Sequence, residues 1–233
     1  MSFKAALARY ERWQERWRDP ILTALLVLMS LGVFVNIPVS RSYELGAPVF
    51  VVGWFLLIIS AVLIAARHWI AIVAILLSSL LTLVANILRV DELSRLTICL
   101  GAGSLVVFMT ALGWVVWSAV FGPGEVTHHR IQGAVVLYLS IALSFAALYE
   151  ILLALNPGSI SGIAARGAYP VLGRALVYYS LSTLTSTGYG DLLPIHPLAR
   201  SLSNLEAVIG QLFPATLLAR IVTLEMQGRR RAD

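Results

Sequence analysis

Six apolar segments run along the chain, and each approaches or exceeds the roughly 20 helical residues that cross the hydrocarbon core of a bilayer. The chain is 59% hydrophobic and 12% charged, with a mean hydropathy of +0.85. A soluble domain of 233 residues cannot bury that much apolar surface. The sequence therefore predicts an all-α membrane protein with six transmembrane helices, at Ile21–Ile37, Ala47–Ala66, Trp69–Leu88, Leu96–Phe121, Ile131–Leu155 and Ala199–Leu224.

The basic residues indicate how these spans are oriented. If the N-terminus is inside, most of the 17 Lys and Arg residues fall in inner segments, which is the usual bias of membrane proteins. We therefore expect a multi-pass protein of the cell membrane with both termini in the cytoplasm. The net charge of +5 then reflects topology and contact with anionic membrane lipids, and nothing in the sequence supports nucleic-acid binding.

Residues 1–19 precede the first span and combine apolar side chains at helical spacing with basic residues on the other faces. This pattern predicts an amphipathic helix that lies on the inner leaflet. Such a helix either anchors the chain or acts as a cuff that couples the membrane to the rest of the protein. The anchor is the simpler interpretation.

A seven-residue segment between the last two spans carries hydroxyls, two glycines and an acid: Thr185, Ser186, Thr187, Gly188, Tyr189, Gly190 and Asp191. Carbonyls alternate in direction along an ordinary extended chain, so turning them all to one side requires unusual backbone dihedrals. Gly188 and Gly190 permit such dihedrals because they have no Cβ. The segment resembles the selectivity filter of the potassium channel family, in which a ring of backbone carbonyls replaces the water around the ion.

The resemblance covers residues 131–224 and implies a pore module. It implies an outer helix, a re-entrant pore helix from Pro170 to about Leu184, the filter and an inner helix. It also implies a homotetramer, because one chain supplies one filter strand and the ring of carbonyls in this family takes four. Potassium ions would be coordinated by the carbonyls of Ser186, Thr187, Gly188 and Tyr189, together with the Ser186 hydroxyl.

Three residues before the filter match positions that support it in this family. Tyr178 and Tyr179 occupy the place of an aromatic pair that packs behind the filter as a cuff. Ser182 stands where some members carry a glutamate that pairs with the filter aspartate. Because that carboxylate is missing, we expect a tyrosine hydroxyl to support Asp191.

Two filter positions depart from the family pattern, since Ser186 stands in place of the usual Thr and Thr187 in place of Val or Ile. These departures leave two alternatives to a potassium-selective channel open. One is a cation channel of weak selectivity, and the other is a non-conducting membrane subunit that keeps a pore-like fold. Ion flux from the purified protein in liposomes discriminates between the three.

The inner helix carries a second match to the family. Gly210 lies at the usual position of a hinge glycine, and Pro214 follows one turn later, where proline can kink the helix. Glu206 also lies within this span, and an acid there needs a partner, for which an ion pair is the simplest expectation. The predicted cavity lining is a stripe of four residues: Gln211, Pro214, Leu218 and Val222.

The remaining parts of the chain bear on gating. Residues 20–122 are predicted to form a four-helix transmembrane domain without a voltage sensor, because Leu96–Phe121 contains no Lys or Arg. Residues 225–233 are predicted to be a short cytoplasmic tail. His128 and His129 are expected on an inner loop, either as a solvated turn or as a pH sensor. The carboxylates are scattered and no catalytic constellation is present, so the sequence does not indicate an enzyme.

Overall fold

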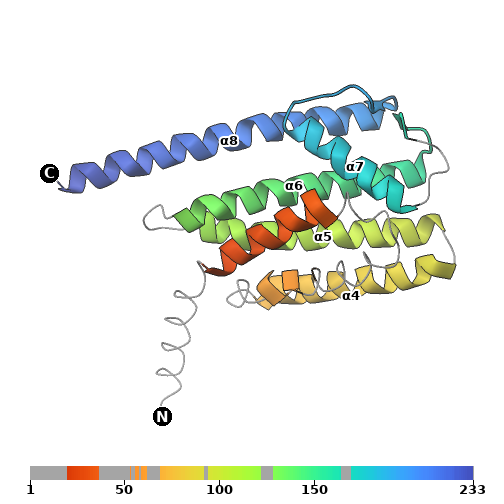
Figure 1. The fold of residues 1–233 in the computed structure, drawn as a ribbon, viewed down its shortest axis with the longest axis horizontal. Helices are drawn as coiled ribbons and strands as arrows, with labels where there is room; N and C mark the ends of the chain where they lie inside the picture. Colours follow the sequence, from red (N-terminus) through yellow and green to blue (C-terminus); the bar gives the residue numbers. More distant parts are fainter. Residues whose placement is uncertain are drawn as a thin grey trace, which may run out of the picture.

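The computed structural model describes residues 20–36, 53, 56–57, 59–61, 69–91, 94–121, 128–163 and 169–232. A first helical segment, residues 20–31, continues into the short π-helix η1 (Gly32–Asn36). The labelled elements that follow are α4 (Trp69–Asp91), α5 (Arg95–Val120), α6 (His128–Leu155), β1 (Ile160–Ser161), α7 (Tyr169–Leu184), β2 (Leu193–Pro194) and α8 (Pro197–Ala232). Figure 1 shows α4, α5, α6 and α8 running alongside one another, with α7 crossing near one end.

The described helices support a helical protein that crosses the membrane several times. Three helical segments are long and apolar enough to span a bilayer, at Arg95–Ser118, Ile131–Leu155 and Pro197–Arg220. Pro20–Val35 and Trp69–Ala85 are shorter apolar helices. Most of the predicted second span, and all of the predicted amphipathic helix at 1–19, lie outside the described residues, so the count of six spans stays a prediction.

Two helix boundaries differ from the sequence-based expectation. α6 begins at His128, so His128 and His129 belong to its first turn and not to a loop. α8 continues to Ala232, so the segment predicted as a separate tail extends the inner helix. Both differences arise because apolar periodicity locates the membrane-crossing part of a helix, whereas the helix itself continues into polar sequence as long as no breaker intervenes.

The helix starts follow from local chemistry. The Ser94 hydroxyl accepts a hydrogen bond from the Thr97 backbone N–H at 3.2 Å, which caps the first turn of α5. α7 has Pro170 as its second residue, where proline is tolerated because the first-turn N–H groups have no partner within the helix. The helix predicted from about Pro170 to Leu184 is therefore present as α7.

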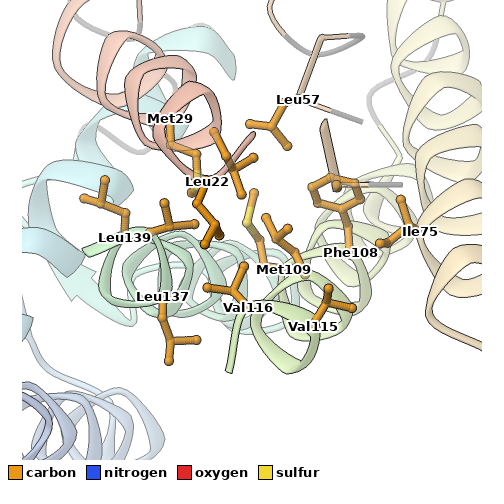
Figure 2. Packing of buried hydrophobic residues seen from close by; sticks show 14 of the residues in the cluster. Leu22, Met29, Leu57, Ile75, Phe108, Met109, Val115, Val116, Leu137 and Leu139 are labelled. Carbon is orange, nitrogen blue, oxygen red and sulfur yellow. The ribbon is translucent and has the colours of Figure 1, made fainter. Parts of the chain in front are cut away.

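One hydrophobic core joins the first helical segment, α4, α5 and α6, and Figure 2 shows its side chains converging from these elements. Two polar contacts tie the same elements together. Thr82 Oγ1 of α4 lies 2.7 Å from Ser104 Oγ of α5, and the Thr23 hydroxyl donates to Gln132 Oε1 of α6 at 2.6 Å. The labelled core residues are Leu22, Met29, Leu57, Ile75, Phe108, Met109, Val115, Val116, Leu137 and Leu139.

A second core lies behind α7 and joins it to α6 and α8. Its buried members include Tyr149 of α6, Leu176 and Tyr179 of α7, and Ala199 of α8. Because α6 contributes to both cores, it connects the first helices of the chain to α7 and α8. This packing holds α7 from two sides and sets the position of the segment that follows it.

The segment after Asp191 is fixed by a small antiparallel sheet. β1 pairs with β2 in the register Ile160 to Pro194 and Ser161 to Leu193. The Ser159 carbonyl also accepts hydrogen bonds from the N–H groups of Ile195 and His196, at 2.8 and 3.2 Å. The loop that leaves α6 therefore holds the chain between Asp191 and α8 in place.

Candidate functional site

The seven residues from Thr185 to Asp191 connect the end of α7 to the turn before β2. All seven are exposed in the single chain, and the Tyr189 side chain is 67% exposed. Their neighbours on either side are anchored, by α7 before them and by the β1–β2 pair after them. The segment is thus an uncovered stretch of backbone held at both ends.

Every second residue from Ser186 to Gly190 has a positive backbone φ angle. Ser186 has φ of 55°, Gly188 has φ of 55° and Gly190 has φ of 80°, whereas Thr187 and Tyr189 between them are not in the positive region. The two glycines take this conformation without a Cβ penalty, but for Ser186 it costs on the order of 1 kcal/mol. Such alternation is the unusual dihedral pattern needed to turn successive carbonyls toward one side.

The backbone N–H groups of residues 185–188 point back to α7. Those of Thr187 and Gly188 both donate to the Ser182 carbonyl, at 2.9 and 3.2 Å, and that of Ser186 donates to the Thr183 carbonyl at 2.9 Å. A planar trans peptide directs its C=O opposite to its N–H. The carbonyls of Ser186 and Thr187 are therefore directed away from α7, toward the uncovered side.

The side-chain hydroxyls of the segment are tied to their surroundings. Thr185 Oγ1 donates to the Leu181 carbonyl at 2.7 Å and lies 2.8 Å from Thr187 Oγ1. Ser186 Oγ accepts a hydrogen bond from Gln211 Nε2 of α8 at 2.8 Å. A hydroxyl oxygen has two lone pairs, so this bond leaves Ser186 Oγ one further acceptor position.

The two tyrosines predicted as a cuff point to different partners. The Tyr178 ring stacks on the Tyr189 ring, with centroids 5.6 Å apart and planes 13° apart, and Asp191 lies near enough to the Tyr178 hydroxyl to interact with it. Of the two tyrosines, Tyr178 is therefore the one near Asp191, and its support of that carboxylate stays a prediction. Tyr179 instead reaches the Ser203 hydroxyl of α8 at 2.7 Å. Ser182 contributes its backbone carbonyl to the filter segment, while its own hydroxyl donates to the Tyr179 carbonyl.

Gly210 brings α8 directly against the end of α7. A Cβ at this position would overlap the carbonyl oxygen of Leu184, so only glycine permits the approach. The same carbonyl accepts a hydrogen bond from the Tyr138 hydroxyl of α6 at 3.1 Å. The structure therefore gives Gly210 a packing role beside the filter segment, and the predicted hinge stays a prediction.

The stripe predicted to line a cavity lies on α8. The side chains of Gln211, Pro214 and Leu218 are exposed in the single chain, and α8 continues through Pro214. Val222 lies on the same helix, but its side chain is outside the described part. Of these residues, Gln211 contacts the filter segment directly, through Ser186.

The ion pair expected for Glu206 is replaced by a different arrangement. Glu206 is fully buried, at 0% exposure, and the described hydrogen-bond partners of its carboxylate are the hydroxyls of Tyr149 and Ser180. Sequence reasoning missed Tyr149 and Ser180 because hydroxyl residues in apolar helices are common and most bond to their own helix. The sequence indicates only that an acid within a span needs a partner, and it does not identify which residues provide one.

A family model described as an ion channel matches residues 172–227. The match includes most of α7, the filter segment and α8 as far as Gln227. No curated protein and no solved structure matches the chain. The family match indicates a channel rather than an enzyme, and together with the membrane-crossing helices it indicates passive ion conduction by a multi-pass membrane protein.

Proposed function

We propose that the protein is a potassium-selective channel that conducts potassium ions passively through a homotetrameric pore. In this proposal residues 185–191 form the selectivity filter, and the carbonyls of Ser186, Thr187, Gly188 and Tyr189 coordinate the ion. The Ser186 hydroxyl contributes to the innermost site. Membrane lipids surround the assembly, and the protein resides in the cell membrane with both termini in the cytoplasm.

The backbone of the segment carries this proposal. Positive φ values at Ser186, Gly188 and Gly190 alternate with ordinary values, and carbonyls of α7 accept hydrogen bonds from the N–H groups of residues 186–188. An arrangement of this kind leaves carbonyl oxygens free on one side, as is needed to replace the hydration shell of a cation. α7 also directs its C-terminal end, which has partial negative charge, toward the segment.

The exposure of the segment supports an assembly around an axis. A lone row of carbonyls cannot enclose an ion, whereas identical chains related by a rotation axis place identical rows on a ring. The native mass of the purified protein in detergent should therefore equal four chains. A conducting species of one or three chains would contradict the tetramer.

Potassium flux into liposomes tests the conducting function, and Gly188→Ala tests the filter. Gly188 has φ of 55° and an added Cβ meets no atom within 4 Å, so in the single chain the substitution acts through the backbone alone. We expect the variant to lose selective potassium flux. Gly103→Ala is the matched control, because Gly103 lies within helix α5, has no positive φ and has open space at the Cβ position. If Gly188→Ala conducts potassium over sodium as well as the parent, residues 185–191 are not the filter.

A weakly selective cation channel is the second candidate, and the conformation of Ser186 favours it. Ser186 has a positive φ without being glycine. The strain of this conformation can loosen the innermost site. Reversal potentials with potassium on one side and sodium on the other separate the two candidates, and a protein without flux would be the non-conducting subunit.

A further inference from the structure

A buried polar cluster lies where α6, α7 and α8 meet, and it contains none of residues 185–191. It consists of five residues from three helices, and each is less than a tenth exposed. We call it the Glu206 cluster, and its members are Tyr149 of α6, Tyr179 and Ser180 of α7, and Ser203 and Glu206 of α8.

Glu206 is the centre of this cluster. The Tyr149 hydroxyl donates to Glu206 Oε2 at 2.7 Å, and the Ser180 hydroxyl hydrogen bonds to Glu206 Oε1. Ser180 Oγ also lies 2.7 Å from the Ala142 carbonyl oxygen of α6. Each oxygen of the carboxylate thus contacts a different helix, and the carboxylate joins α6, α7 and α8 at one point.

A second set of contacts braces the same junction. Ser203 Oγ lies 3.2 Å from the Tyr149 hydroxyl and 2.7 Å from the Tyr179 hydroxyl. The Tyr149 and Tyr179 rings meet edge to face, with centroids 4.9 Å apart. The tyrosines therefore hold the hydroxyls of the cluster in a fixed orientation.

Stability alone does not explain a carboxylate at this site. Transfer of an acid into an apolar interior is costly, and a hydrophobic side chain of similar volume often packs there at no loss of stability. The carboxylate instead fixes geometry. Its two oxygens bond to donors on two other helices, and both bonds form only in one relative position of the three helices.

The position of α7 matters because its carbonyls accept the hydrogen bonds from the backbone N–H groups of residues 185–188. Ser180 lies two residues before Ser182, whose carbonyl accepts hydrogen bonds from the N–H groups of both Thr187 and Gly188. One turn beyond Glu206 along α8, Gly210 abuts the Leu184 carbonyl at the end of α7. The same face of α8 therefore contacts α7 at two levels, through a hydrogen bond and through close packing.

We propose that Glu206 is a positioning residue for ion selectivity. It fixes α7 between α6 and α8 through Tyr149 and Ser180, and so holds the Ser182 carbonyl where it orients the backbone of Thr187 and Gly188. This role rests on the proposed function of residues 185–191 as the filter.

The test compares the potassium-to-sodium permeability ratio of the full-length tetramer with that of three variants. Tyr149→Phe and Ser180→Ala each remove one donor to Glu206 and leave the helices intact, and Glu206→Leu removes both acceptors. We expect the ratio to fall by roughly two- to tenfold for each lost hydrogen bond. Glu206→Gln should restore the parent ratio, because the amide accepts from Tyr149 and donates to Ser180 Oγ while Ser180 donates to the Ala142 carbonyl.

Ser104→Ala is the matched control, because it removes a buried hydroxyl that bonds to Thr82 in the helices away from the filter. It should leave the permeability ratio unchanged. If Glu206→Leu does not assemble, Tyr149→Phe and Ser180→Ala still decide the question. If the parent is selective and the Tyr149→Phe and Ser180→Ala variants keep its permeability ratio, the positioning role alone is overturned. This holds even if the two variants melt at lower temperature. A parent without potassium flux overturns the proposed function and this role together.

Discussion

Gly210 of α8 lies directly against the backbone carbonyl of Leu184, the last residue of α7. Two explanations of this glycine lead to different experiments. A hinge glycine supplies backbone freedom to a moving helix, whereas a packing glycine supplies space for another backbone. The contact with Leu184 favours the second, and it lies next to the first residue of the filter segment.

The first prediction concerns Gly210→Ala. In a helix that merely needs to form, alanine is favoured over glycine by about 1 kcal/mol. At Gly210 the added methyl group would overlap the Leu184 carbonyl, so we expect the protein to melt at lower temperature and to lose ion flux. Circular dichroism in detergent measures the melting, with Gly103→Ala as the control. A variant of unchanged stability but altered opening would instead support the hinge.

The second prediction concerns the hydrogen bond between Gln211 and Ser186. This bond helps to hold Ser186 in its positive-φ conformation, and its loss costs about 0.5–1.5 kcal/mol. If potassium binding stabilises the folded tetramer, Gln211→Leu should raise the potassium concentration that gives half of this stabilisation by roughly two- to tenfold. Melting temperatures measured across a potassium series give that concentration.

The control for this variant is Gln132→Leu. Gln132 also makes a side-chain hydrogen bond, as the acceptor from Thr23, but it lies among the first helices of the chain. The Gln132→Leu variant should lower the melting temperature at every potassium concentration. It should leave unchanged the potassium concentration that gives half of the stabilisation. An equal shift of that point in both variants would mean that Gln211 does not act through the ion site.

Several parts of this arrangement are predictable from the sequence because they depend on local pattern. Apolar runs locate the long helices, Pro170 marks the start of α7, and the two glycines mark the backbone that needs positive φ. The family match to residues 172–227 agrees with the channel interpretation of the same segment. Such features need no knowledge of what each residue touches.

Other parts depend on tertiary contacts that periodicity does not contain. Tyr178 and Tyr179 are adjacent in sequence, yet one stacks on Tyr189 and the other reaches Ser203, because neighbouring helical residues point about 100° apart. The hydroxyl partners of Glu206 come from α6 and α7, far away in the chain. The Gly210 approach to Leu184 likewise appears only once two helices are packed.

The third prediction concerns Arg220, which links the C-terminal half of α8 to the end of α5. Its guanidinium donates to the Phe121 carbonyl at 2.6 Å and lies 4.8 Å from the centroid of the Phe121 ring. The last carbonyls of a helix have no partner within it, and a cation there is also favoured by the helix dipole. Arg220→Leu should therefore loosen α8 and speed amide hydrogen exchange beyond residue 220 by roughly ten- to a hundredfold, since a charged hydrogen bond contributes about 1.5–3 kcal/mol.

Mass spectrometry of peptides from the end of α8 measures this exchange. Arg200→Leu is the matched control, because Arg200 also donates to a backbone carbonyl, that of Pro194, but at the opposite end of the same helix. It should leave exchange beyond residue 220 as in the parent. Equal protection in the Arg220→Leu variant and the parent would show that the contact with Phe121 does not hold α8.

The fourth prediction is that the open probability depends only weakly on voltage. Moving one elementary charge through the membrane field contributes about 2.3 kcal/mol per 100 mV, so steep gating needs several charges that move within the field. The basic residue of α5 is Arg95, at its first position and exposed, and the rest of that helix carries no Lys or Arg. α6 likewise has its basic residue, Arg130, in its first turn. Planar-bilayer recordings in symmetric potassium should give a shallow conductance–voltage relation. A steep sigmoidal relation that implies several gating charges per subunit would mean that basic residues at the helix ends, such as Arg89 or Arg95, lie within the field.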